Sequence, residues 1–299
     1  MADDTCEILV EKFKLPLWNS LIQMTLSLIL VAESGITIYV NCRSLKLREK
    51  TSTKLVTSLA VSSGLSGFLV FILMVVKLIP MAPKKSINEY LLELLIIAPR
   101  TLHLISVLFL CCLTLDRYLA ICWPLRYHDL MTESRCRLLV MGCWLLTLMV
   151  VCVLNVCVFL LSKCKNSLDN LFFFITFYLL TFTLAIIAIM GMYFLIAREF
   201  WRKRHQTSEV TKAMQDDIKR LREKTTRDVL VIVLLNLIFA SPDVILKLLW
   251  LVSKDMRKIL NEITPLLLHI HLLFFLPLFA WRNADFNAAL LTCCFAVKT

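Results

Sequence analysis

The stretch that decides the fold is LDRYLAICWPLRY, residues 115–127. It follows a long apolar run that carries almost no charge, and it opens a basic loop. Asp116 and Arg117 stand side by side where the apolar run ends, and charged side chains are costly within the hydrocarbon of a membrane. The pair is therefore expected at the boundary between membrane and water, at the end of a membrane-spanning helix.

The composition around this stretch also indicates an integral membrane protein. Of the 299 residues, 59% are hydrophobic, whereas soluble domains are about 45–50% apolar. Only 5 residues are Gly and 8 are Pro, which suits long helices better than a membrane β-barrel with its many turns. The net charge of +11 does not predict nucleic-acid binding, because the charges fall in the gaps between apolar segments. The 12 cysteines lie mostly inside apolar stretches and form neither a disulfide framework nor a metal-site pattern.

Apolar segments long enough to cross a membrane recur along the whole chain, since each crossing needs about 20 residues. The prediction is an all-α membrane protein, a seven-transmembrane helix bundle forming a single domain over residues 1–299. Residues 1–17 are expected to be an extracellular tail, 18–281 the bundle, and 282–299 a cytoplasmic tail. The predicted spans are 18–42, 54–79, 89–119, 136–162, 170–199, 226–252 and 259–281.

The positions of Lys and Arg predict how the bundle is oriented. With the amino terminus outside, the inner gaps hold about twice as many Lys and Arg residues as the outer gaps, as the positive-inside rule requires. This orientation places Asp116 and Arg117 in the cytoplasm and predicts a multi-pass protein of the plasma membrane with an extracellular amino terminus. The first 16 residues are mixed and charged, so no cleavable signal peptide is expected and the first span would direct insertion.

The tail after the seventh span predicts a short amphipathic helix. Phe286, Ala289 and Leu290 share one helical face at spacings of three and four residues, so the helix is expected on the inner membrane surface. Cys293 and Cys294 directly follow and are candidate palmitoylation sites. The alternative is that both cysteines stay unmodified.

Seven spans, with Asp-Arg-Tyr ending the third and Pro124-Leu125-Arg126-Tyr127 following, resemble the rhodopsin-like (class A) G-protein-coupled receptors. The match continues through Met131-Thr132 to Trp144. Within that family the loop, and the tail RNADFNAAL at 282–290, are most similar to those of odorant receptors. The resemblance implies a receptor, chemosensory in type, that binds a small ligand in the outer half of the bundle. It would activate a heterotrimeric G protein through Asp116-Arg117-Tyr118.

The chain departs from the family pattern at several positions, which makes it a divergent odorant-type member. Ser63 stands where the second helix of the family has Asp, and Gly35 where the first has Asn. The seventh span reads Leu-Pro-Leu-Phe-Ala at 276–280 in place of Asn-Pro-x-x-Tyr. The third span has no Cys near its outer end. A disulfide between Cys6 and Cys164 is one expectation that follows.

The resemblance also implies a switch at the cytoplasmic end. Asp116 would hold the Arg117 guanidinium until activation releases it toward the Gα subunit, and Arg suits this because it is always charged and can change partners. The alternative is a charge pair that only anchors the helix. A buried structural tyrosine is likewise the alternative for Tyr193. The residues expected to form the switch are Asp116, Arg117, Tyr118, Pro124, Tyr193, Glu223 and the helix-six hinge Pro242.

Charged and polar residues in the outer half of the spans form the candidate ligand site. Arg100 in a membrane span would be costly unless it faces a cavity or a partner. It is therefore either a cationic anchor for a small acid or polar odorant, or part of an interhelical charge network with Glu93 or Asp243. The candidate ligand-binding residues are Pro99, Arg100, His103, Asp243, Lys247 and His269.

Two other function classes compete with the chemosensory receptor. One is an orphan receptor of the same fold for a non-odorant ligand, and the other is a small transporter or channel. Against the transporter, the sequence has no inverted repeat and no matching pair of Gly/Pro-broken spans. An enzyme is not expected, because no catalytic residue pattern or metal-ligand spacing is present. The expected partners are a heterotrimeric G protein, a small-molecule ligand and membrane lipids, with no cofactor, metal or nucleic acid.

Overall fold

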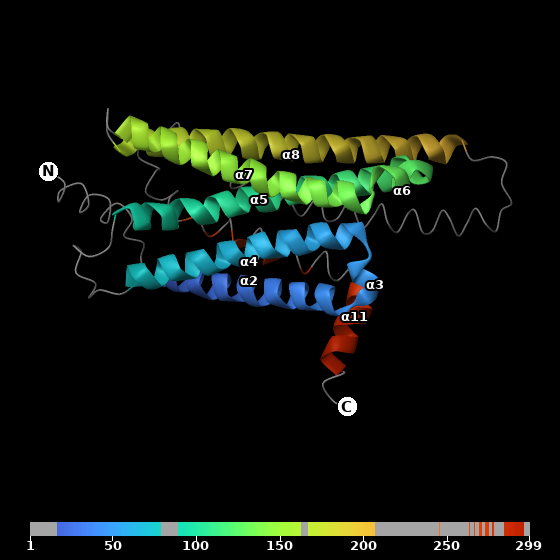
Figure 1. Cartoon of the computed structure of the whole chain (residues 1–299), viewed down its shortest axis with the longest axis horizontal. Helices are drawn as coiled ribbons and strands as arrows, with labels where there is room; N and C mark the ends of the chain where they lie inside the picture. Colours follow the sequence, from blue (N-terminus) through green and yellow to red (C-terminus); the bar gives the residue numbers. More distant parts are fainter. Residues whose placement is uncertain are drawn as a thin grey trace.

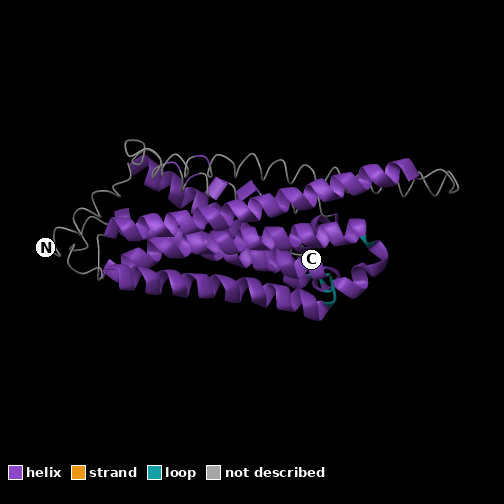
Figure 2. Cartoon of the chain, turned by 90° about the horizontal axis from the view of Figure 1, so that it is seen from above, coloured by secondary structure: helices purple, strands orange, loops and turns teal. Residues whose placement is uncertain are grey.

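The computed structural model describes residues 17–78, 89–162, 167–206 and 284–295, together with eight single positions between 245 and 277. Within these residues every regular element is a helix, and the long helices lie side by side along the longest axis of the molecule (Figures 1 and 2). The all-α prediction is confirmed for this part of the chain. The sixth and seventh predicted spans, 226–252 and 259–281, lie outside the described residues except at the single positions.

Five long helices correspond to the first five predicted spans. They are α2 (Leu17–Arg43), α4 (Thr51–Leu78), α5 (Glu89–Cys122), α7 (Glu133–Ser162) and α8 (Ser167–Gln206). Their ends differ from the predicted ends by a few residues, except that α8 continues well past 199 into the basic segment. Among the residues searched, four helical stretches are long and apolar enough to cross a membrane: Leu17–Arg43, Thr51–Leu78, Ile97–Cys122 and Leu180–Glu199.

Short helices gather at one end of the bundle, where the basic loops also lie (Figure 1). They are α3 (Leu45–Arg48), the 3-10 turn η1 (Pro124–Arg126), α6 (Tyr127–Leu130) and α11 (Ala284–Phe295). The end of α5 with Asp116 lies beside the start of α4 and beside α6, while α11 packs on α2 and α3. The predicted amphipathic helix of the tail is therefore confirmed as α11.

Small residues let α2 and α4 approach closely. A Cβ atom on Gly67 would meet the backbone oxygen of Ser27 at 3.1 Å, and one on Gly64 would meet Cβ of Ser34 at 3.0 Å. Within a membrane, helices associate through such close packing because lipid offers no hydrophobic driving force between them. The α2–α4 pair therefore forms a rigid side of the bundle.

Among the residues that the structure describes, the largest buried cluster includes Phe109 of α5, which is fully buried. Leu55 and Leu59 of α4 pack into the same cluster, and Ile189 of α8 joins it. The Trp144 ring of α7 lies 6.1 Å from the Phe109 ring. This cluster joins four helices directly above Asp116, so it fixes where the charged end of α5 points.

Candidate functional site

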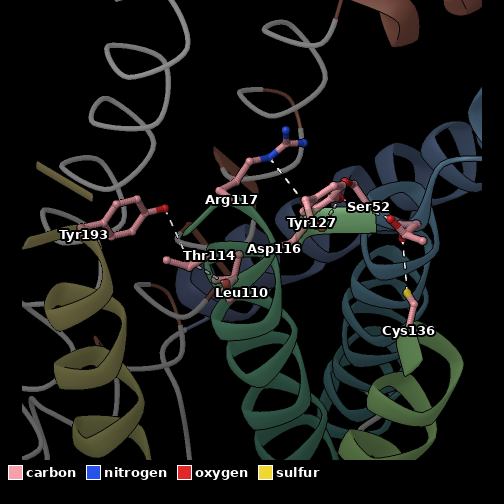
Figure 3. A network of polar contacts seen from close by, with 9 residues as sticks. Ser52, Leu110, Thr114, Asp116, Arg117, Tyr127, Cys136 and Tyr193 are labelled. Carbon is pink, nitrogen blue, oxygen red and sulfur yellow. Dashed lines mark hydrogen bonds and ion pairs between the residues drawn. The ribbon is translucent and has the colours of Figure 1, made fainter. Parts of the chain in front are cut away.

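The Asp116 carboxylate is the centre of a polar network at the inner end of α5 (Figure 3). Its side chain is buried, with 1% exposure. The Ser52 hydroxyl of α4 donates to Oδ2 at 2.8 Å, and the Tyr127 hydroxyl of α6 donates to Oδ1 at 2.7 Å. Each carboxylate oxygen thus receives one short hydrogen bond, from two different elements.

Arg117 is held far less tightly than Asp116. Its Nε atom lies 3.9 Å from Asp116 Oδ2, and its side chain is 37% exposed. A partly exposed ion pair of this kind contributes about 0–1 kcal/mol, whereas each hydrogen bond to a charged group contributes about 1.5–3 kcal/mol. Ser52 and Tyr127 therefore anchor Asp116, and Arg117 is the group that can leave.

The turn after α5 brings Tyr127 back to Asp116. The amide of Arg126 donates to the Trp123 carbonyl at 3.1 Å, which closes the turn at Pro124. The Tyr127 hydroxyl also lies 3.5 Å from the Thr51 hydroxyl at the start of α4. Burial raises the pKa of the Tyr127 hydroxyl, and the hydrogen bond to Asp116 raises it further, against an opposing effect of Thr51. Tyr127 therefore remains a protonated donor at neutral pH.

Contacts from α7 hold this loop against α4. Lys54 forms an ion pair with Glu133, and that hydrogen bond lowers the pKa of the exposed Glu133 carboxyl. The Cys136 thiol donates to the Thr51 carbonyl at 3.4 Å. The Tyr118 ring packs 6.3 Å from the ring of Trp123. The whole inner loop is thus tied to the ends of α4, α5 and α7.

Tyr193 of α8 meets α5 one turn above the charged pair. The Thr114 hydroxyl lies 3.4 Å from the Tyr193 hydroxyl and 2.8 Å from the Leu110 carbonyl, which is its better acceptor (Figure 3). This long contact fits both the switch tyrosine and the structural tyrosine of the sequence analysis. The other two predicted switch residues, Glu223 and Pro242, lie outside the described residues.

Neutral hydroxyl groups occupy the place of the missing helix-two Asp. Ser63 is buried, and its hydroxyl lies 3.4 Å from that of Ser106 on α5. Ser62 contacts the same Ser106 hydroxyl at 2.8 Å. This part of the α4–α5 contact therefore carries hydrogen bonds and no charge.

The outer half of α5 holds three of the predicted ligand-binding residues. Pro99 is buried, and its carbonyl accepts a hydrogen bond from Ser66 of α4 at 3.1 Å. His103 is 1% exposed, and its ring stacks on Phe182 of α8 with centroids 5.6 Å apart. Arg100, which lies between Pro99 and His103 in the sequence, is partly buried. His269 is also buried, with 1% exposure.

A second cation, Lys77, was not among the predicted ligand residues. It lies in the last turn of α4, and its ammonium group and the Arg100 guanidinium repel each other electrostatically. The predicted Asp243 and Lys247 lie outside the described residues, as does the side chain of Glu93. The described part of the ligand side is therefore positively charged.

The tail helix α11 packs on the corner formed by α2 and α3. Phe286 is 3% exposed and lies in a cluster with Val40 and Leu47, and Ala289 and Leu290 pack against it. The predicted apolar face is therefore confirmed, but its Phe286 is covered by protein. Asp285 binds Lys46 at 2.7 Å and also Lys50, and these two hydrogen bonds lower the pKa of Asp285 to about 2.

The predicted modification sites are only partly covered by the structure. Cys293 is a free, half-buried thiol on α11. Cys294 is on the same helix, but its side chain is not described, and Cys6 and Cys164 lie outside the described residues.

Asp116, the centre of the site, could be predicted from the sequence, whereas the two hydroxyl groups that donate to it could not. Tyr127 belongs to the loop motif, but the spacing of the motif does not predict that the Tyr127 hydroxyl donates to Asp116. Ser52 is 64 residues away on another helix. Ser52 precedes the predicted second span, 54–79, and no motif marks it.

Comparison with known proteins places the chain among membrane receptors. A family model described as the 7 transmembrane receptor (rhodopsin family) matches residues 33–276. Short segments resemble octopamine receptor 1 of Lymnaea stagnalis, with 51% identity over 47 residues, 16% of this chain and 7% of that protein. Trace amine-associated receptor 365 of Petromyzon marinus is 51% identical over 45 residues, 15% of this chain and 12% of that protein. Olfactory receptor 11H7 of Homo sapiens is 55% identical over 38 residues, 13% of this chain and 12% of that protein. The matched segment thus spans 7% to 12% of these three relatives.

Proposed function

The chain belongs to the rhodopsin family of seven-transmembrane receptors, and from this premise we propose that it is a chemosensory receptor that activates a heterotrimeric G protein. A small ligand binds in the outer half of the bundle. The G protein binds at the inner end of α5, through Asp116, Arg117 and Tyr118. The transporter or channel alternative is not favoured by the family.

The observation that carries this proposal is the unequal hold on the two charges. Asp116 receives two short hydrogen bonds, whereas Arg117 lies 3.9 Å from the Asp116 carboxylate, its ion-pair partner in the described part of the chain. A switch needs one group that stays and one that moves. Asp116 is the fixed group, and Arg117 is the mobile cation.

In the proposed mechanism, ligand binding favours a bundle in which the sixth span swings outward at the hinge Pro242. This opens a cytoplasmic cleft, and Arg117 turns from Asp116 to the carboxyl-terminal helix of a Gα subunit. The ligand acts by binding the open arrangement more tightly than the closed one. Tyr193 on the fifth span and Glu223 at the start of the sixth are proposed as the alternative partners of Arg117 during the switch.

The charges of the outer half favour an acidic ligand. Arg100 and Lys77 lie close enough to repel each other at that end of α4 and α5, so we propose that the carboxylate of a small acid binds there through charge-assisted hydrogen bonds, whereas both cations would repel an ammonium ligand. His103, His269 and Pro99 are proposed to line the same site, with Asp243 and Lys247 from the sixth span. These cations favour an odorant-type acid over an amine, although amine receptors are among the relatives.

The orientation and modifications follow from the same proposal. The amino terminus is extracellular and the protein resides in the plasma membrane, as supported by the excess of Lys and Arg at the end that carries α3, α6 and α11. Cys293 and Cys294 are palmitoylated at the inner surface. Cys6 and Cys164 form an outer disulfide in place of the one that the family makes from the third span.

The test is guanine-nucleotide exchange on purified G protein by membranes that contain the expressed chain, screened first with small carboxylic acids. Arg117→Ala should abolish ligand-stimulated exchange, because the mobile cation is lost. Arg126→Ala is the matched control, since Arg126 is an exposed arginine in the turn that directly follows α5. Full exchange with Arg117→Ala at equal surface expression would refute this coupling site, and ligand flux without exchange would favour a transporter.

A further inference from the structure

Two cysteines from different membrane helices meet inside the bundle. Cys112 Sγ of α5 and Cys143 Sγ of α7 lie 3.6 Å apart, and the two residues are 31 positions apart in the sequence. Both are free thiols, and both are half-buried. They lie at the edge of the cluster around Phe109, where α5 and α7 pack together.

The contact suits bond formation between the two sulfur atoms. A disulfide needs an S–S distance of about 2.05 Å, so each sulfur has to move by less than about 1 Å. At 3.6 Å one thiol donates a hydrogen bond to the other sulfur. Such a bond stabilises negative charge on the acceptor, and the thiolate is the reactive form of cysteine.

The other described thiols near this pair have different neighbours. Cys111, next in the sequence, donates to the Ala185 carbonyl of α8 at 3.5 Å. Cys136 of α7 donates to the Thr51 carbonyl of α4. Each of these thiols is thus directed to a backbone oxygen, whereas Cys112 and Cys143 are directed to each other.

The surroundings of the pair indicate where an oxidant would come from. On α7, the large apolar side chains Met141, Leu145 and Met149 are exposed, at 56%, 61% and 66%. On a membrane-spanning helix these side chains face the acyl chains of lipid. A half-buried thiol on the edge of that face is reached by molecules that dissolve in hydrocarbon.

We propose that Cys112 and Cys143 are an oxidisable dithiol site within the membrane, which a fatty-acyl hydroperoxide converts into a disulfide that joins α5 to α7. One sulfur attacks the peroxide, the O–O bond breaks, and a sulfenic acid and a lipid alcohol form. The second sulfur displaces hydroxide from the sulfenic acid, so the S–S bond forms and water leaves. In total, two thiols lose two electrons and two protons, and one hydroperoxide is reduced to an alcohol and water.

Such a bond would form close to the switch. Cys112 precedes Asp116 by four residues, which is one helical turn. A disulfide at this level fixes α5 against α7 just above the charged end. The site therefore gives peroxidised lipid a covalent route to the part of the helix that carries Arg117.

The experiment treats the full chain in lipid nanodiscs with cumene hydroperoxide and maps its peptides without reduction. The expected product is a linked peptide pair containing Cys112 and Cys143, with a mass about 2 Da below the sum of the two thiol peptides. Cys112→Ser and Cys143→Ser should each abolish it. Cys111→Ser is the matched control and should leave the product unchanged, and Cys→Ala versions serve where a serine variant does not fold.

Three results would overturn the inference. They are a link from Cys143 to Cys111 in place of Cys112, both thiols intact after most of the hydroperoxide is consumed, or separate sulfinic acids without a link. Hydrogen peroxide at the same concentration should react more slowly, and a faster reaction would contradict entry from the lipid. The product is read as a mass, so the outcome is independent of whether the protein activates a G protein.

Discussion

At the scale of single residues, the coupling site depends on how differently its neighbours are held. Asp116 is buried and doubly hydrogen-bonded, while Arg117, one residue further, is 37% exposed. The difference arises because Ser52 of α4 and Tyr127 of α6 donate hydrogen bonds to Asp116. Adjacent Asp and Arg residues in the sequence do not reveal this asymmetry. It becomes visible only from the positions of Ser52 and Tyr127 in the structure.

Tyr127→Phe should raise ligand-independent nucleotide exchange. The change removes one hydroxyl donor from Asp116 and leaves the ring, so the resting state loses up to about 1.5–3 kcal/mol. Since 1.4 kcal/mol is a factor of ten in an equilibrium, basal exchange should rise by up to about ten- to a hundredfold. The measurement is exchange on purified G protein without ligand, at matched receptor amounts.

Tyr39→Phe is the control for that experiment, because Tyr39 is 58% exposed on α2. It should leave basal exchange at the level of the unmodified chain. If Tyr127→Phe also left basal exchange unchanged, Tyr127 would hold only the loop, and Ser52 alone would anchor Asp116.

At the scale of helices, the sequence pattern predicted which helices exist and how long they are better than it predicted which face of each helix meets its neighbour. Hydropathy located the first five spans to within a few residues at most ends, because long apolar runs have few other stable forms in a membrane. The face of each helix that meets its neighbour is set by small and polar residues that hydropathy does not register. Gly67 against Ser27 on the α2–α4 contact is one example, and Lys77 near Arg100 is another.

Gly67→Leu should destabilise the bundle by separating α2 from α4. A side chain there meets the Ser27 carbonyl, Leu30 and Val31, all within 3.3 Å of the first added carbon. Overpacking of this kind costs about 1–3 kcal/mol. The measurement is the midpoint of thermal unfolding in detergent, which should fall by several degrees.

Gly142→Leu provides the matched substitution. A Cβ on Gly142 of α7 meets nothing within 4 Å, so the added side chain extends into lipid or detergent. Its unfolding midpoint should stay the same or rise slightly, because Gly is a poor helix former. An equal loss of stability in both variants would contradict the close α2–α4 contact.

At the scale of the whole molecule, two charged ends are connected by an apolar bundle. The end that carries Asp116 could be recognised from sequence, since the basic loop and Asp116 mark it directly, and its position on the inner side stays a prediction. The outer end could be predicted only as a group of candidates, because Arg100 has several possible partners on other helices and the sequence does not rank them. The structure adds Lys77 of α4 to these candidates. Asp243 and Lys247, the candidates from the sixth span, lie outside the described residues.

Arg100→Ala should weaken the response to small carboxylic acids, because the proposed anchor for their charge is lost. The expected result is a rise of at least about tenfold in the concentration for half-maximal exchange, corresponding to one charge-assisted hydrogen bond of about 1.5 kcal/mol or more. Surface expression is measured in parallel by labelling intact cells. An unchanged dose–response curve at normal expression would assign Arg100 to interhelical packing.

The length of α8 has a mechanical consequence. A helix of 40 residues is about 60 Å long, twice the roughly 30 Å of hydrocarbon that it crosses. It is the helix that reaches furthest at the end of the molecule that carries α6 and α11 (Figure 1). It therefore acts as a lever, since a tilt of about 5° about Phe182 displaces Arg202, about 30 Å further along the helix, by about 2.6 Å. A movement too small to disturb the packing around Phe182 would be amplified at Arg202 into one that a docked protein can detect.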